Sequence, residues 1–103
     1  MPVITVFGPP LSPAEVNLAL KAVNAAAARA LNLPAEAVHS MFLPATAGAT
    51  GTKAEPAWPA ALLHGPAGDA AEMAAATTAV AAVLGGVWGQ PVEHTWVHWI
   101  VTG

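Results

Sequence analysis

The second residue of the chain offers chemistry that no internal position can supply. Pro2 follows Met1, and an initiator methionine before so small a residue is normally removed, which would leave Pro2 with a free secondary amine. A free α-amine has a pKa near about 8, and burial beside apolar neighbours such as Trp96 or Trp99 would lower it, because a low dielectric disfavours the ammonium. We therefore predict that Pro2 is the catalytic residue, a proton shuttle near neutral pH.

The histidines do not form a metal-binding pattern. His94 and His98 fall in the segment Glu93 to Val101, which we interpret as a strand. Four residues of strand span about 13 Å, too far for one ion bound at about 2.1 Å from each ligand. No thiolate or carboxylate-rich segment accompanies His39 and His64 as a source of further metal ligands. We expect no metal site and no cofactor.

Composition restricts the partners. The chain has 103 residues, 55% of them hydrophobic and 9% charged, which is more apolar surface than so small a monomer can hide, and this favours an oligomer. The net charge is −3, and the three cations are scattered, so we expect no nucleic-acid partner.

Two further features concern location. The chain has no cysteine, and no basic residue precedes its first apolar run, so we expect a reducing, cytoplasmic setting and no signal peptide. The apolar run from Ala70 to Gly89 is mostly Ala and Gly and contains Glu72, so we interpret it as a buried helix and expect no membrane association.

The first half of the chain reads as strand, helix, strand. Residues 3–7 are β-branched or aromatic and are stopped by Gly8 and two prolines. Ser12 before Pro13, with Glu15 three residues on, predicts a capped helix from about Pro13 to Leu33. Residues 38–43 predict a second strand, and residues 44–56 an irregular, mobile connection.

The second half repeats this plan 57 positions later. The shift pairs Pro2 with Pro59, Ser12 with Asp69, and Pro34 with Pro91, so helix caps and prolines punctuate both halves alike. We predict one domain, residues 1–103, made of two β-α-β repeats at about 2–45 and 59–103. Because Pro59 is internal, its nitrogen is an amide and cannot act as a base, so the chain offers one catalytic amine.

Two β-α-β units predict an α+β fold, an α/β sandwich with a four-stranded mixed sheet and two helices on one face. In the last strand, Trp96 and His98 point one way and Trp99 the other, so both sheet faces carry aromatic residues. An apolar helix-free face again requires partner subunits. The same element order fits either a tautomerase-type pair or a ferredoxin-like fold.

The opening Met1-Pro2, the helix start Ser12-Pro13-Ala14-Glu15, and Leu31-Asn32-Leu33-Pro34 followed by Val38-His39 resemble the tautomerase superfamily typified by 4-oxalocrotonate tautomerase. The resemblance covers about the first 45 residues, and the second half as a duplicated unit. It implies an N-terminal proline acting as general base or acid on a small carbonyl or enol substrate, and a homotrimer.

The sequence also departs from that family. Dicarboxylate-specific tautomerases have an arginine in the first strand-to-helix turn and another in the following strand, where this chain has Pro10-Leu11 and His39. Without a guanidinium fork we do not expect a dicarboxylate substrate. His39, Trp96 and Trp99 are the candidate substrate-binding residues, with His39 polarising a carbonyl or binding one carboxylate.

Three functions remain open at this point. The first is a keto-enol tautomerase or isomerase that uses Pro2. The second is a catalytically silent trimer or small-ligand-binding protein of the same fold, which the missing arginines favour. The third is a ferredoxin-like monooxygenase or ligand sensor, which would be a dimer.

Overall fold

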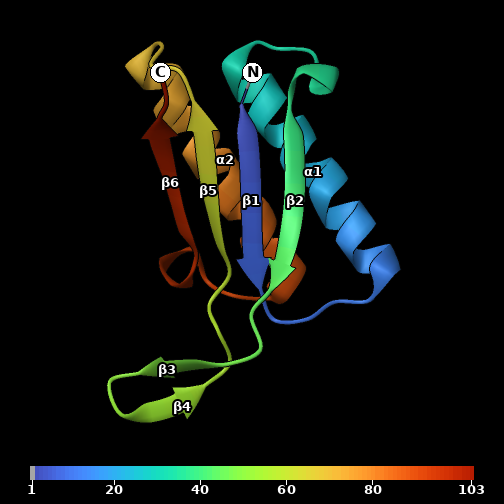
Figure 1. Ribbon diagram of the computed structural model, residues 1–103, viewed down its shortest axis with the longest axis vertical. Coiled ribbons are helices and arrows are strands. Elements are labelled where there is room, and N and C mark those ends of the chain that lie inside the picture. Colours follow the sequence, from blue (N-terminus) through green and yellow to red (C-terminus); the bar gives the residue numbers. More distant parts are fainter. Residues whose placement is uncertain (1) are drawn as a thin grey trace.

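The computed structural model describes residues 2–103, which form a four-stranded sheet with two helices and a small separate hairpin (Figure 1). The elements of the first half are β1 (Val3–Gly8), α1 (Pro13–Leu31), a 3-10 turn (Ala35–Ala37) and β2 (His39–Pro44). Those of the second half are β5 (Ala60–Gly65), α2 (Ala70–Trp88), a 3-10 turn (Val92–His94) and β6 (Trp96–Val101). Each element of the second half begins and ends 57 residues after its counterpart.

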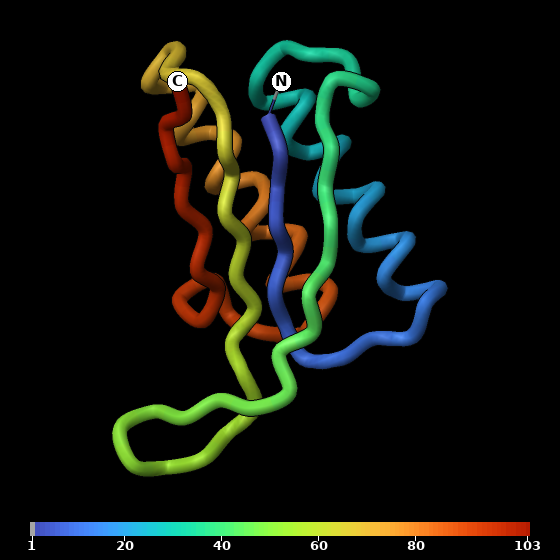
Figure 2. Tube along the Cα trace, in the orientation of Figure 1, coloured from blue at the N-terminus to red at the C-terminus, as the bar shows by residue number. Residues whose placement is uncertain are grey.

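The strand order of the sheet is β2-β1-β5-β6. Within each half the two strands are parallel, because the intervening helix carries the chain back to the starting end, whereas β1 and β5 pair antiparallel at the centre. Both helices cover the same face, and both chain ends lie at the same end of the sheet (Figures 1 and 2). The predicted mixed sheet with two helices on one face is therefore confirmed.

The core lies between the sheet and the helices. Alternate residues of the central strands, such as Ile4, Val6 and Leu63, are fully buried against the helices. Val23 from α1 and Leu84 from α2 meet them from the other side and are equally buried. This packing of α1 and α2 on the central strands β1 and β5 holds the sheet and the helices together.

Helix caps set the bounds of both helices. Ser12 and Glu15 form the predicted capping box, and Asp69 caps α2 by accepting a hydrogen bond from the Glu72 amide at 2.9 Å. Helix α1 ends at Leu31 rather than Leu33, because Asn32 adopts a left-handed conformation with φ 57°. Helix α2 continues past Gly85 and Gly86 to Trp88 and is capped by Gly89 at φ 63°.

The segment between the halves is more regular than the sequence indicates. Strands β3 (Gly48–Thr50) and β4 (Lys53–Glu55) pair antiparallel across a turn in which Gly51 has φ 58°. Figure 2 shows this hairpin, which we call the arm, projecting beyond the end of the sheet. The prediction of an irregular connection is corrected on this point, since the alternation that marks longer strands cannot show in three residues.

The final strand is shorter than expected. Glu93 and His94 lie in a 3-10 turn, and β6 begins only at Trp96. Outside the strand, the His94 ring stacks on Trp58 with a centroid separation of 4.1 Å. The predicted alternation of Trp96 and His98 against Trp99 holds within β6, where Trp99 packs on the core and Trp96 is 58% exposed.

By length and mean hydropathy (1.5), α2 is the one described helix that could cross a membrane. In this fold it presents Ala76, Val80 and Leu84 to the core. Only 22% of its most apolar window is buried within the chain, so the expected buried helix packs along one face and leaves the rest of its surface accessible.

Candidate active site

Pro2 lies at the wall of a pocket between the two helices, at the end of the sheet where β1 begins. The pocket has a volume of about 260 Å³. Pro2 is buried and, by the alternation of β1, shares the helix-side face of the sheet with Ile4. The walls come from the end of α1, the turn before α2, the first turn of α2 and strand β6: Leu31, Leu33, Pro66, Ala67, Gly68, Asp69, Glu72, Met73 and Trp99.

The N-cap and first turn of α2 supply two titratable side chains to this wall, those of Asp69 and Glu72. A helix N-terminus normally attracts anions through its unpaired amides. Here Asp69 takes the amide of Glu72, and the Gly68 amide points to the Met73 sulfur at 3.4 Å. The chain's own groups therefore take the amide of Glu72 within the helix and that of Gly68 before it.

Trp99 closes the pocket from the strand side. Its ring lies over Gly65, where a Cβ would come within 2.9 Å of Cζ2, so only glycine leaves room for the indole. The Trp99 Nε1 atom is buried and has no hydrogen-bond partner. Because this atom has almost no accessible surface, the ring of Trp99 rather than its N–H borders the open pocket.

The opposite end of the sheet, beside Pro59, is built differently. Leu31 corresponds to Trp88 by the 57-residue shift, and the Trp88 ring covers Gly8, the counterpart of Gly65. Trp88 Nε1 donates to the Pro9 carbonyl at 3.0 Å, and the ring stacks on Phe42. The hollow at this end, about 370 Å³, is lined by neither Pro59 nor Trp88.

The predicted site residues are only partly assembled within one chain. Pro2 and Trp99 line the same pocket. The His39 amide donates to the Pro2 carbonyl at 3.3 Å, but its side chain shares the helix-free face with its register partner Val3 and is exposed. Trp96 lies beside Pro59, whose carbonyl accepts its amide at 3.0 Å, so any role for Trp96 at a Pro2 site requires a neighbouring subunit.

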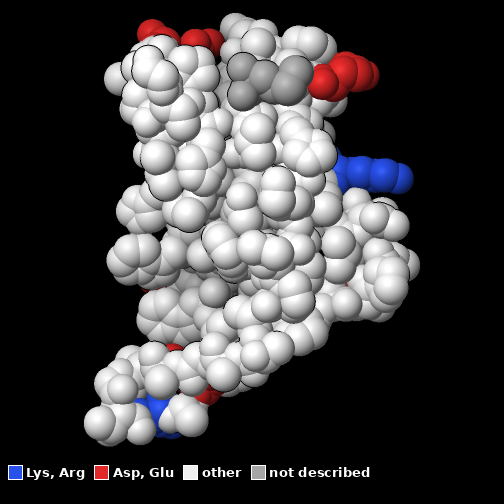
Figure 3. Space-filling view, in the orientation of Figure 1, with Lys and Arg blue, Asp and Glu red and all other residues white. Residues whose placement is uncertain are grey.

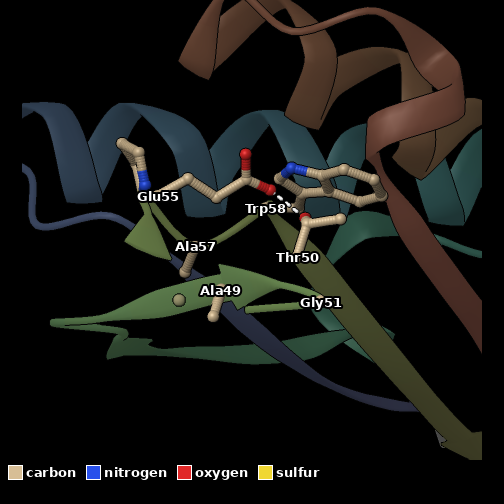
Figure 4. A pocket seen from close by; sticks show the side chains of 8 residues that line it. Ala49, Thr50, Gly51, Glu55, Ala57 and Trp58 are labelled. Atoms are coloured by element: carbon tan, nitrogen blue, oxygen red, sulfur yellow. Dashed lines mark hydrogen bonds between the residues drawn. The ribbon is translucent and has the colours of Figure 1, made fainter. Parts of the chain in front are cut away.

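A second hollow lies under the arm. It measures about 500 Å³ and is bordered by Gly48, Glu55 and Trp58 (Figure 4). The view shows the Thr50 hydroxyl hydrogen-bonded to the Glu55 carboxylate, and the rest of the wall consists of the Trp58 ring, Pro56 and small residues. No amine or imidazole lines this hollow among residues 2–103, so it offers less acid–base chemistry than the Pro2 pocket.

Sequence reasoning missed Leu31, Asp69, Glu72 and Met73 as walls of the pocket. The repeat did contain a signal. Leu31 in the first half is aligned with the larger Trp88 in the second half, and this difference in size decides that the pocket stays open beside Pro2 and not beside Pro59. Asp69 and Glu72 were identified only as helix-start residues, because the meeting of α2 with the first residue of β1 depends on the antiparallel centre of the sheet.

Comparison with known proteins supports the architecture. No family model and no curated sequence matches the chain. Among solved structures, "R7 fused 4-OT wild type asymmetric trimer" matches with TM-score 0.89 and 20% identity, covering 97% of this chain and 85% of that one. "F6 fused 4-OT wild type asymmetric trimer" matches with TM-score 0.86 and 23% identity, over the same shares.

A more distant structure extends the comparison. "Crystal structure of Leishmania major MIF2" matches with TM-score 0.84 and 18% identity, covering 99% of this chain and 89% of that one. These structures share the sheet and helix arrangement over nearly the whole chain. Because the sequence identities are low, the similarity concerns the fold. The chain therefore has the tautomerase fold, in the fused two-unit form of the 4-OT structures.

Proposed function

We propose that the protein is a keto–enol tautomerase that uses the amine of Pro2, freed by removal of Met1, as a proton shuttle on a small carbonyl or enol substrate. The observation that carries the proposal is the asymmetry between the two prolines. Pro2 lines an open pocket, whereas Pro59 is fully buried and lines no described pocket. The neutral amine would take the enol proton and return it to the neighbouring carbon, so substrate and product are isomers.

Two opposing effects set the basicity of the Pro2 amine. Burial disfavours the ammonium, whereas the carboxylates of Asp69 and Glu72 in the same pocket favour it. The pH dependence of kcat/KM reports the balance, because only the unprotonated amine can act as the base.

The decisive experiment compares two proline variants. We expect the intact mass of the purified protein to lack one methionine, and Pro2→Ala to lower ketonisation of phenylenolpyruvate and of its methyl ester by at least about 100-fold, the usual contribution of a positioned acid–base group. Pro59→Ala changes the equivalent proline of the second half and should retain activity if the variant melts cooperatively.

Retention of Met1, or equal rates for Pro2→Ala and the parent, would refute the mechanism. The protein would then be a silent member of the fold.

We also propose that the protein is a homotrimer assembled through the helix-free face of the sheet. The register places three rows of side chains on this face: His39, Val3, His64 and Ile100; Met41, Thr5, Leu62 and His98; Leu43, Phe7, Ala60 and Trp96. Figure 3 looks onto this face, where charged side chains appear only at the rim and on the arm. A sheet face whose three rows are mostly apolar and contain no Lys, Arg, Asp or Glu is typical of a buried interface, and the fused 4-OT structures are described as trimers.

Sedimentation equilibrium tests the assembly. Leu62 lies in the middle row of the face, so Leu62→Asp should shift the mass from three chains to one. Leu18→Asp is the matched control, because Leu18 is 69% exposed on α1 and away from the sheet. A trimer that survives Leu62→Asp, or a parent protein that is not trimeric, would contradict this assembly.

A further inference from the structure

We infer that the Pro2 pocket selects uncharged carbonyl or enol compounds with a flat apolar body and rejects carboxylates. The inference rests on the proposed function for turnover, but it also predicts binding, which is measured separately. It follows from two properties of the wall: its charge and its apolar surface.

The charge of the wall is negative. Asp69 and Glu72 both border the pocket, and no Lys or Arg in the described part of the chain does so. The Glu72 amide in the first turn of α2 donates to Asp69, and the Gly68 amide before the helix donates to the Met73 sulfur. A carboxylate entering this space would meet the two like charges of Asp69 and Glu72.

In a homo-oligomer, every subunit has the same sequence. A neighbouring subunit could therefore offset the negative charge of the pocket only with one of this chain's own cationic side chains. The three cations are Lys21, Arg29 and Lys53, and all are exposed in a single chain. Of these, Lys53 lies on the arm, which projects beyond the sheet (Figure 1). Lys53→Ala therefore tests whether the arm of one subunit supplies a counter-charge to the pocket of another.

The remaining wall suits a neutral, flat molecule. Leu31, Leu33, Met73 and the Trp99 ring are apolar, and methionine and tryptophan pack well against planar groups. Trp99 Nε1 is the one unpaired buried side-chain donor among residues 2–103. Because this atom is buried away from the pocket, a ligand would meet the face of the indole and not its N–H.

Binding and turnover give separate tests. By isothermal titration, cinnamamide should bind the purified protein at least about tenfold more tightly than cinnamate, which has the same skeleton and a negative charge. Asp69→Asn and Glu72→Gln together should bring the two affinities together by improving cinnamate binding, while Asn at position 69 preserves the helix cap.

The turnover arm uses phenylenolpyruvate and its methyl ester, for which kcat/KM of the ester should exceed that of the acid by about tenfold or more. Failure to turn over either compound would refute the proposed function but not the selectivity, provided that cinnamamide still binds preferentially. The inference is overturned if cinnamate binds as tightly as cinnamamide, if neither binds at millimolar concentration, or if Lys53→Ala abolishes a measurable affinity for cinnamate.

Discussion

Exchange of Trp88 for leucine tests the claim that an indole closes the Pro59 end of the fold. The substitution places at position 88 the residue that the first half has at position 31. It removes the hydrogen bond to the Pro9 carbonyl, the stack on Phe42 and the cover over Gly8. We expect a destabilised protein in which the hollow at this end now extends toward Pro59.

The magnitude follows from these three losses. Leucine is smaller than tryptophan by roughly 60 Å³, and an unfilled space of that size costs about 1.4 kcal/mol. The lost hydrogen bond costs about 1 kcal/mol, and the lost aromatic pair about 0.5 to 1.5 kcal/mol. Because Trp88 is only partly buried, we expect the free energy of unfolding to fall by about 2 to 3 kcal/mol.

Urea unfolding followed by circular dichroism provides the measurement, at one fixed protein concentration because assembly adds stability. Trp88→Phe is the matched variant, since it keeps an aromatic ring against Phe42 but has no N–H, and should cost about 1 kcal/mol or slightly more. An apolar dye that binds Trp88→Leu but not the parent would report the opened space. An unchanged urea midpoint for Trp88→Leu would refute the reasoning.

Three further predictions concern other parts of the fold. Gly8→Ala should lower the free energy of unfolding by about 1 to 3 kcal/mol, because the new Cβ would lie 2.5 Å from Trp88 Cζ2 and the ring must shift; a thermal melt equal to that of the parent would contradict this. Leu31→Trp should fill the Pro2 pocket and abolish cinnamamide binding in titration while the protein still melts cooperatively; retained affinity would show that the pocket is not the binding site. The hydrogen bond that the Ser12 amide donates holds the pKa of Glu15 below its ordinary value, so its contribution is present above about pH 4.3 and is lost as the pH falls through the lowered pKa. Glu15→Gln should therefore destabilise the protein at pH 7, with the difference in melting temperature from the parent vanishing in strong acid, and a pH-independent difference would exclude this origin.

The local elements and their repetition were readable from the sequence. Caps and prolines act on the backbone within a few residues, so Ser12, Glu15 and Pro13 define the start of α1 without knowledge of the rest. Their recurrence at Asp69 and Glu72 with an unbroken spacing indicated two copies of one unit, from which the mixed sheet follows. The arm and the last turn of α1 were misjudged, because three-residue strands and a left-handed cap leave weak patterns.

The sequence by itself determined the element order, the core periodicity and the one proline that can carry a free amine. Only the tertiary structure decided what surrounds that proline. The antiparallel pairing of β1 with β5 brings the start of α2, with Asp69 and Glu72, to Pro2, and the register turns His39 toward the opposite face. Leu31 at the end of α1 leaves a pocket open beside Pro2, whereas Trp88 at the end of α2 covers the equivalent position beside Pro59. These outcomes depend on contacts between residues far apart in the chain, which local propensity does not encode.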